Sequence, residues 1–124
     1  MRWDKFTLKA QEAVQEAVSL AKGLSHQQAD NEHLLLALLK QEDSIIAELL
    51  AGLGLNTASL TREIENDLKG RSKIYAKAQE VYFSARLNSL LTKAEKEAGQ
   101  LGDEYISVEH LFLAMLEEPG ILAK

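Results

Sequence analysis

The sequence predicts an all-α fold made of two tandem, pseudo-symmetric repeats, and three observations support this prediction. The chain has one proline in 124 residues, which suits helices because proline disrupts helix interiors. Apolar residues recur at spacings of three and four positions, the period of amphipathic helices. The octamer EHLLLALL, which starts at Glu32, recurs as EHLFLAML from Glu109, an offset of about 77 positions.

The repeat extends well beyond the octamer. The same offset aligns Phe6 with Phe83 and Thr7 with Ser84, and it holds without a gap as far as Gln41. A register that also holds across the preceding helix is stronger evidence than a match between two leucine-rich stretches. We therefore predict one domain over 1–124, with a first repeat over about 4–70, a linker over 71–82 and an incomplete second repeat over about 83–124.

Helices are predicted where a segment with apolar periodicity follows a residue that caps helix N-termini. The expected starts are near Thr7, Asp30, Ser44, Asn56 or Thr57, Ser84 and Ser107. Gly52 and Gly70 follow the third and fourth helices of the first repeat, where glycine favours a helix end. In the second repeat, Pro119-Gly120 follows the octamer helix and residues 121–123 match the start of the third helix, so this repeat is expected to be truncated.

Composition argues against several classes of function. The chain has 19 Asp and Glu against 14 Lys and Arg, a formal net charge of −5, which argues against nucleic acid as the main ligand. No apolar run approaches the roughly 20 residues of a membrane span, and no signal-peptide core follows Met1. We therefore expect a cytoplasmic protein that binds neither nucleic acid nor a membrane.

The sequence shows no arrangement of residues typical of catalysis or metal binding. It has no cysteine and no Gly-x-Ser-x-Gly turn. His26, His33 and His110 lack metal-ligand spacing, and the equivalent His33 and His110 are interpreted as partly buried residues at helix ends. The glycine-rich segment at 52–57 is interpreted as a helix end and turn, and the basic segment at 69–73 as a solvated linker. We expect no enzymatic activity, metal or cofactor in this chain.

Two hydroxyl–carboxylate pairs repeat with the fold, Thr7 with Glu32 and Ser84 with Glu109. If the members of each pair meet at neighbouring helix N-termini, they form two equivalent acidic pockets suited to a cationic or amide-rich ligand group. Alternatively, all four residues only stabilise helix starts, because hydroxyls cap the backbone and carboxylates interact favourably with the helix dipole. The sequence leaves both interpretations open.

Three stretches resemble the Clp N-terminal domain: the opening MRWDKFT, the segment EHLL from Glu32, and LGDEYISVEHL at 101–111. The resemblance covers essentially the whole chain and is closest to the ClpB branch, the AAA+ protein disaggregases. It implies eight helices in two four-helix repeats, tethered to a homohexameric motor whose downstream modules bind ATP and Mg²⁺. It also implies a non-catalytic domain that recruits unfolded or aggregated polypeptide through an apolar surface groove.

The same resemblance implies substrate-binding residues. Thr7, Asp103 and Glu109 match polar positions that matter in the ClpB domain, and Leu91 matches an apolar groove position. His110 stands where an aliphatic residue is common, so the sequence departs from the family pattern at this point of the groove.

The resemblance also implies an alternative function. In the ClpC branch, the N-terminal domain of a protease-partner unfoldase docks adaptor proteins and reads phosphoarginine tags. Thr7, Glu32 and Glu109 match that tag-reading pattern, and Ser84 is a conservative fit. An adaptor-docking or tag-reading domain is therefore the second expectation beside substrate recruitment.

Overall fold

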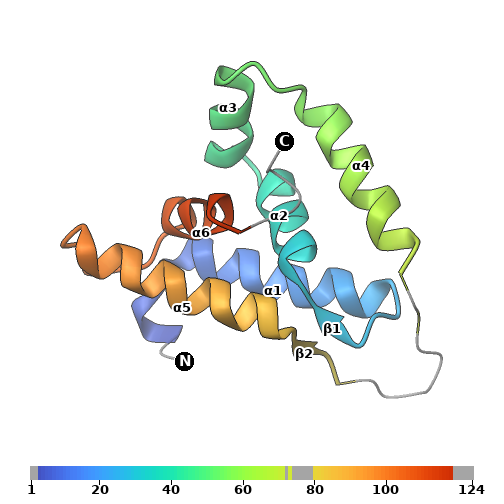
Figure 1. The fold of residues 1–124 in the computed structure, drawn as a ribbon, viewed down its shortest axis with the longest axis horizontal. Helices are drawn as coiled ribbons and strands as arrows, with labels where there is room; N and C mark the ends of the chain where they lie inside the picture. Colours follow the sequence, from blue (N-terminus) through green and yellow to red (C-terminus); the bar gives the residue numbers. More distant parts are fainter. Residues whose placement is uncertain (1–2, 72, 74–79, 119–124) are drawn as a thin grey trace.

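Six α-helices and two very short strands form the part of the chain that the computed structural model describes, residues 3–71, 73 and 80–118 (Figure 1). In chain order the elements are η1 (Trp3–Lys5, a 3-10 helix), α1 (Leu8–Gly23), β1 (Gln28–Ala29), α2 (Asn31–Lys40), α3 (Ile45–Gly52), α4 (Thr57–Lys69), β2 (Tyr82–Phe83), α5 (Ala85–Gln100) and α6 (Val108–Leu116). The predicted all-α fold is confirmed. Most of the predicted linker, the Pro119-Gly120 break and the match at 121–123 lie outside the described residues.

Each helix begins after a side chain that accepts a hydrogen bond from an early backbone N–H. The caps are Thr7, Asp30, Ser44, Asn56, Ser84 and Ser107, which confirms the predicted starts. At α2 and α6 a histidine completes the cap, because His33 Nδ1 accepts from Asp30 N and His110 Nδ1 accepts from Ser107 N, both at 2.9 Å. The helix starts therefore repeat with the offset found in the sequence.

The two repeats are joined by reciprocal backbone pairing. β1, which leads into α2, pairs in parallel with β2, which leads into α5. An isolated parallel bridge joins Phe6, just before α1, to Ile106, just before α6. The two pairings are related by the sequence offset. As a result, the start of α5 lies against the start of α2, and the start of α1 lies against the start of α6.

The core lies where α1 packs along α2 and α5 packs along α6. The inner face of α1 is made of small side chains, which let α2 approach closely: Ala10, Ala13, Ala17 and Ala21, all without exposed surface. Gln41, just past α2, donates to Lys9 O at 2.9 Å, so α2 runs back along α1. α3 and α4 both contact α2, on the side away from α1 and α5 (Figure 1).

One core position differs in polarity between the repeats. Asn31 is 1% exposed, and neither polar atom of its amide has a hydrogen-bond partner among the described residues. Its repeat equivalent is Val108, which is also buried. Burial of an amide without partners is unfavourable, whereas valine carries no such cost.

We therefore expect Asn31→Val to raise the free energy of unfolding by about 1 kcal/mol. Urea denaturation of both proteins measures the difference, and the control is the reverse exchange, Val108→Asn, which is expected to lower stability. A loss of stability in Asn31→Val would show that the amide has a structural role that valine cannot supply.

Candidate functional site

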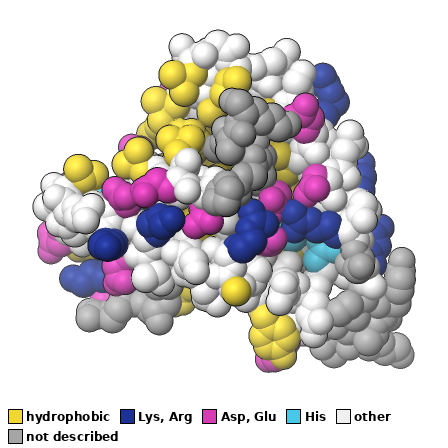
Figure 2. All heavy atoms as spheres, viewed as in Figure 1, with side chains coloured by type: hydrophobic (Ala, Val, Ile, Leu, Met, Phe, Trp, Pro, Cys, Tyr) yellow, Lys and Arg dark blue, Asp and Glu magenta, His cyan; other side chains and the backbone are white. Residues whose placement is uncertain are grey.

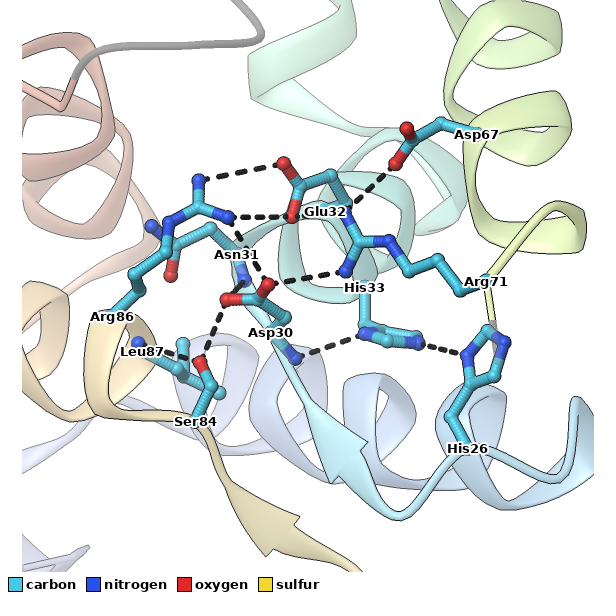
Figure 3. A network of polar contacts seen from close by, with 10 residues as sticks. All are labelled: His26, Asp30, Asn31, Glu32, His33, Asp67, Arg71, Ser84, Arg86 and Leu87. Carbon is cyan, nitrogen blue, oxygen red and sulfur yellow. Dashed lines mark hydrogen bonds and ion pairs between the residues drawn. The ribbon is translucent and has the colours of Figure 1, made fainter. Parts of the chain in front are cut away.

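Five charged side chains meet at the start of α2 (Figure 3). They are called here the α2 charge cluster: Asp30, Glu32, Asp67, Arg71 and Arg86. Arg71, which follows α4, lies 3.1 Å from Asp30 and 2.8 Å from both Glu32 and Asp67. Arg86, in the first turn of α5, lies 3.1 Å from Asp30 and 3.4 Å from Glu32. The cluster therefore ties the end of α4 and the start of α5 to one end of α2.

Hydrogen bonds fix the acidic side of this cluster. Asp30 accepts from Ser84 Oγ at 2.7 Å and from Asn31 N at 2.8 Å. Burial alone would raise the pKa of Asp30. The hydrogen bond from Ser84 and the guanidinium charges outweigh burial, so the pKa of Asp30 lies below its ordinary value. Asp30 is thus held ionised between the two repeats.

Arg71 is the basic centre of the cluster. Its partial burial opposes the charged form, yet the carboxylates of Glu32 and Asp67 raise the pKa of Arg71 above its ordinary value. The basic segment at 69–73, which the sequence indicated as a solvated linker, therefore contains a side chain that is fixed by three carboxylates.

The predicted pairing of Thr7 with Glu32 does not occur in this structure. Thr7 caps the start of α1, accepting from Ala10 N at 3.1 Å. Because α2 runs back along α1, Glu32 lies toward the far end of that helix, which is about 24 Å long. Glu32 is 7% exposed and has two guanidinium groups of this chain as partners, so it does not form an open pocket.

The second predicted pair, Ser84 with Glu109, is also separated. Ser84 is buried, caps α5 through Leu87 N and donates to Asp30 of the first repeat. Glu109, the repeat equivalent of Glu32, is exposed and has no ion-pair partner among the described residues. The reciprocal pairing of the repeats is the reason, because it places each helix start against the other repeat.

Two equivalent side-chain pairs involve the histidines. In the second repeat His110 Nε2 lies 2.8 Å from Asp103 Oδ2, so two of the predicted site residues do meet. In the first repeat His33 Nε2 lies 2.9 Å from His26 Nδ1. The sequence offset aligns His26 with Asp103 and could have identified this pair. His33 and His110 are buried at helix starts, as the sequence indicated.

Leu91 has no exposed surface and belongs to the core, so its side chain does not line a groove in this structure. Its repeat equivalent, Val14, lies at the base of an apolar surface groove with a volume of about 400 Å³. The other lining residues are Trp3, Gln11, Gln15, Val18 and Phe83. We call this the α1 groove. None of its described lining residues is charged, and Trp3 stands edge-on to Phe83 with ring centroids 5.9 Å apart.

The described part of the chain gives no sign of other chemistry. Within residues 3–71, 73 and 80–118, no group of three His, Asp or Glu side chains could hold a metal ion. Among the same residues, no helix is both long and apolar enough to cross a membrane. The described features considered for function are the α1 groove and Glu109, which has no ion-pair partner among the described residues.

A model of the family described as the Clp repeat (R) N-terminal domain matches residues 5–124. The chain belongs to this family. The chaperone protein ClpB of Nitratidesulfovibrio vulgaris is 41% identical over 119 residues, which are 94% of this chain and 14% of that protein. The ClpB of Bacillus anthracis is 36% identical over the whole of this chain and 15% of its own length. The chain therefore spans about one seventh of these relatives, in the region of a non-catalytic domain.

Solved Clp N-terminal domains have the same fold. The Hsp104 N-terminal domain of Candida albicans superimposes with a TM-score of 0.87 at 26% identity, over 94% of this chain and 77% of that one. A structure described as a complex of the ClpV N-domain with a VipB peptide gives a TM-score of 0.75 at 24% identity, over 95% and 71% of the two chains. These structures confirm the predicted Clp N-terminal fold.

Proposed function

We propose that this Clp N-terminal domain recruits unfolded or aggregated polypeptide to a ClpB-type, ATP-dependent protein disaggregase. The similarity to ClpB chaperones supports the class of protein. The observation that supports recruitment is the α1 groove, a surface hollow with an aromatic wall and no charge among its described lining residues. Such a surface binds apolar side chains without selecting one sequence, which suits clients that expose different core segments.

In this role the domain only binds the client, and the ATP-driven motor lies in other parts of the parent protein. A client must be passed on to the motor, so binding in the α1 groove is expected to be weak and reversible. ATP and Mg²⁺ belong in ATPase modules of the parent protein, which we infer to be a cytoplasmic homohexamer. The domain itself needs no cofactor for this role.

Val18 lines the α1 groove and is the residue best suited to a test of binding there. Its repeat equivalent on α5 is Glu95, so the fold already places a glutamate at this helix position. We expect Val18→Glu to weaken binding of a permanently unfolded protein about tenfold, because a charge then enters an apolar contact. Fluorescence anisotropy with labelled, reduced and carboxymethylated lactalbumin measures the change, and circular dichroism checks helicity.

The matched control is Leu101→Glu. Leu101 is 61% exposed and lies outside the α1 groove, so a glutamate at this position adds the same charge away from the groove. Binding by this variant should stay within twofold of the original chain. Equal losses in the two variants, or no loss in Val18→Glu, would rule out the α1 groove as the recruitment surface.

Adaptor docking or tag reading is the second candidate function, and the exposed carboxylate of Glu109 favours it. The equivalent Glu32 already binds Arg71 and Arg86 of its own chain. A tag-reading domain of this sequence would therefore offer one open carboxylate instead of two. This candidate would be favoured over recruitment if the chain bound a phosphoarginine peptide and if Val18→Glu did not weaken binding of the unfolded protein.

A further inference from the structure

One edge of β2 has backbone groups without hydrogen-bond partners. Tyr82 N donates to Gln27 O at 2.9 Å, and Ser84 N makes an equally short bond toward β1. Successive residues of a strand direct their N–H and C=O groups to opposite sides. The N–H and C=O of Phe83, between these two residues, therefore face away from β1. Neither group has a hydrogen-bond partner among the described residues.

The first repeat satisfies the equivalent backbone groups. The sequence offset aligns Phe83 with Phe6, which forms the isolated parallel bridge with Ile106. Phe6 N donates to Trp3 O at 3.0 Å, and Phe6 O accepts from Gln11 Nε2 at 3.0 Å. Both groups of Phe6 that face away from the bridge are thus paired within the chain, as buried or partly buried backbone usually is.

The second repeat lacks both of these partners. The equivalent of Trp3 is Glu80, and the equivalent of Gln11 is Asn88, whose side chain is one methylene shorter than that of glutamine. Glu80 and Asn88 are both described by the structure, and neither forms a hydrogen bond with Phe83. The open strand edge is therefore a property of the second repeat alone among the described residues.

The side chain at this position, and not the path of the backbone, accounts for the open carbonyl. The N-cap of α1, Thr7, has φ −63° and ψ 160°, and the N-cap of α5, Ser84, has φ −65° and ψ 161°. The two helices therefore leave their strands in the same direction. A glutamine in place of Asn88 would reach Phe83 O as Gln11 reaches the equivalent carbonyl of the first repeat.

This open edge lies beside the α1 groove. The ring of Phe83 lines the groove and stands edge-on to Trp3. Tyr82, the other residue of β2, is 53% exposed, and Figure 2 shows hydrophobic surface over β2 at the lower edge of the view. Because side chains alternate between the two faces of a strand, a segment paired with Phe83 would direct every second side chain to the same face as the Phe83 ring.

We propose that client segments bind as an extended strand that pairs with the open edge of β2 and places every second side chain in the α1 groove. Phe83 would donate through its N–H and accept through its C=O. Complementary hydrogen bonding carries this assignment, since an unpaired strand edge is a template for the backbone of another chain. Backbone pairing is independent of client sequence. The inference rests on the proposed recruitment function and specifies the conformation of the bound client.

The experiment uses three labelled peptides of nine residues in which leucine alternates with threonine, flanked by lysines for solubility. One is unmodified, one is N-methylated at every leucine and one at every threonine. N-methylation removes the N–H donor and keeps the side chain. In an added strand only alternate N–H groups face β2. Fluorescence anisotropy should therefore show one methylated peptide binding about tenfold more weakly than the unmodified peptide, and the other within threefold of it.

The two methylated peptides also show when the proposal is wrong. Equal losses would mean that the client binds in another conformation, because N-methylation at either set of positions disrupts a helix. Equal affinities of all three peptides would mean that no backbone pairing occurs. Either result overturns the strand proposal, whereas the Val18→Glu test of the α1 groove with unfolded lactalbumin stands independently of both.

Asn88→Gln tests the same edge from the protein side. It supplies Phe83 O with the partner that Gln11 supplies in the first repeat, so we expect the unmodified peptide to bind about fivefold more weakly. The matched control is Ser89→Gln, which adds the same side chain at the next exposed position of α5 and should stay within twofold of the original chain. Unchanged binding by Asn88→Gln, with helicity retained, would overturn the proposal.

A second copy of the chain is the alternative occupant of this edge, since two open strand edges can pair with each other. Sedimentation velocity at increasing concentration distinguishes the two occupants. We expect the original chain and Asn88→Gln both to keep the mass of a monomer. A dimer that Asn88→Gln dissociates would assign the edge of β2 to self-association and overturn the proposal.

Discussion

Replacing Asp30 with alanine is expected to lower the free energy of unfolding by about 3 kcal/mol. Asp30 caps α2, accepts the Ser84 hydroxyl and lies 3.1 Å from both Arg71 and Arg86. Alanine removes all of these contacts together and leaves a buried hydroxyl and two arginines with fewer partners. The predicted loss corresponds to a fall in Tm of about 10 °C, which differential scanning calorimetry measures.

The second repeat supplies the control for this prediction. Ser107 caps α6 as Asp30 caps α2, but none of the described ion pairs involves it. Ser107→Ala should therefore cost about 1 kcal/mol, the usual value of an N-cap. The difference between the stability losses of the two variants measures the contribution of the α2 charge cluster to the free energy of unfolding. This difference should shrink in 1 M NaCl, where charges are screened. Equal losses in both variants would mean that the cluster adds nothing to capping.

The helices could be predicted from the sequence because their causes are local. Apolar spacing and capping residues act within one turn or one face, and both are visible in the chain order. The starts at Thr7 and Ser84 follow directly from this, as does the equivalence of Asp30 and Ser107. The offset between repeats adds nothing to this local information, but it shows which positions play the same part in each half.

Contacts between the repeats could not be predicted in the same way. The sequence offset is compatible with a contact between Thr7 and Glu32 within one repeat. It is equally compatible with contacts in which each helix start lies against the other repeat, so it does not predict which arrangement forms. The choice is made by β1 and β2, which are two residues each and too short to give an alternating pattern. Arg71 was misinterpreted as solvated for the same reason, since its partners are distant in sequence.

Acid is expected to destabilise the chain through the pair of buried histidines in the first repeat. Because Asp30 N donates to His33 Nδ1, the proton of His33 lies on Nε2 and points to His26 Nδ1. A proton added to either ring brings two N–H groups face to face. Burial, the neighbouring ring and the charge of Arg71 outweigh the carboxylate of Asp30, so the pKa of His33 falls to about 4.

His26 shifts in the same direction. Burial and the charges of Arg71 and Lys73 lower its pKa, although a contact with the Leu68 carbonyl opposes the shift. In the unfolded chain both rings titrate near 6.5. Between pH 6.5 and 4 the unfolded state therefore binds protons that the folded state does not, and stability falls as the pH is lowered. The His33 contribution is complete above pH 6.5 and amounts to about 3 kcal/mol lost by pH 4.

The variant that isolates this effect is His33→Gln, because glutamine at the third helical position can keep the capping box with Asp30 while removing the titrating ring. Urea denaturation at pH 7, 6, 5 and 4.5 should show a shallower loss for His33→Gln than for the original chain. The same change in the second repeat, His110→Gln, leaves the His26–His33 contact in place and should keep the steep loss. The carboxylates are common to all three proteins, so their titration cancels in the comparison. Identical pH profiles for His33→Gln and the original chain would therefore show that the first-repeat histidine pair does not determine acid sensitivity.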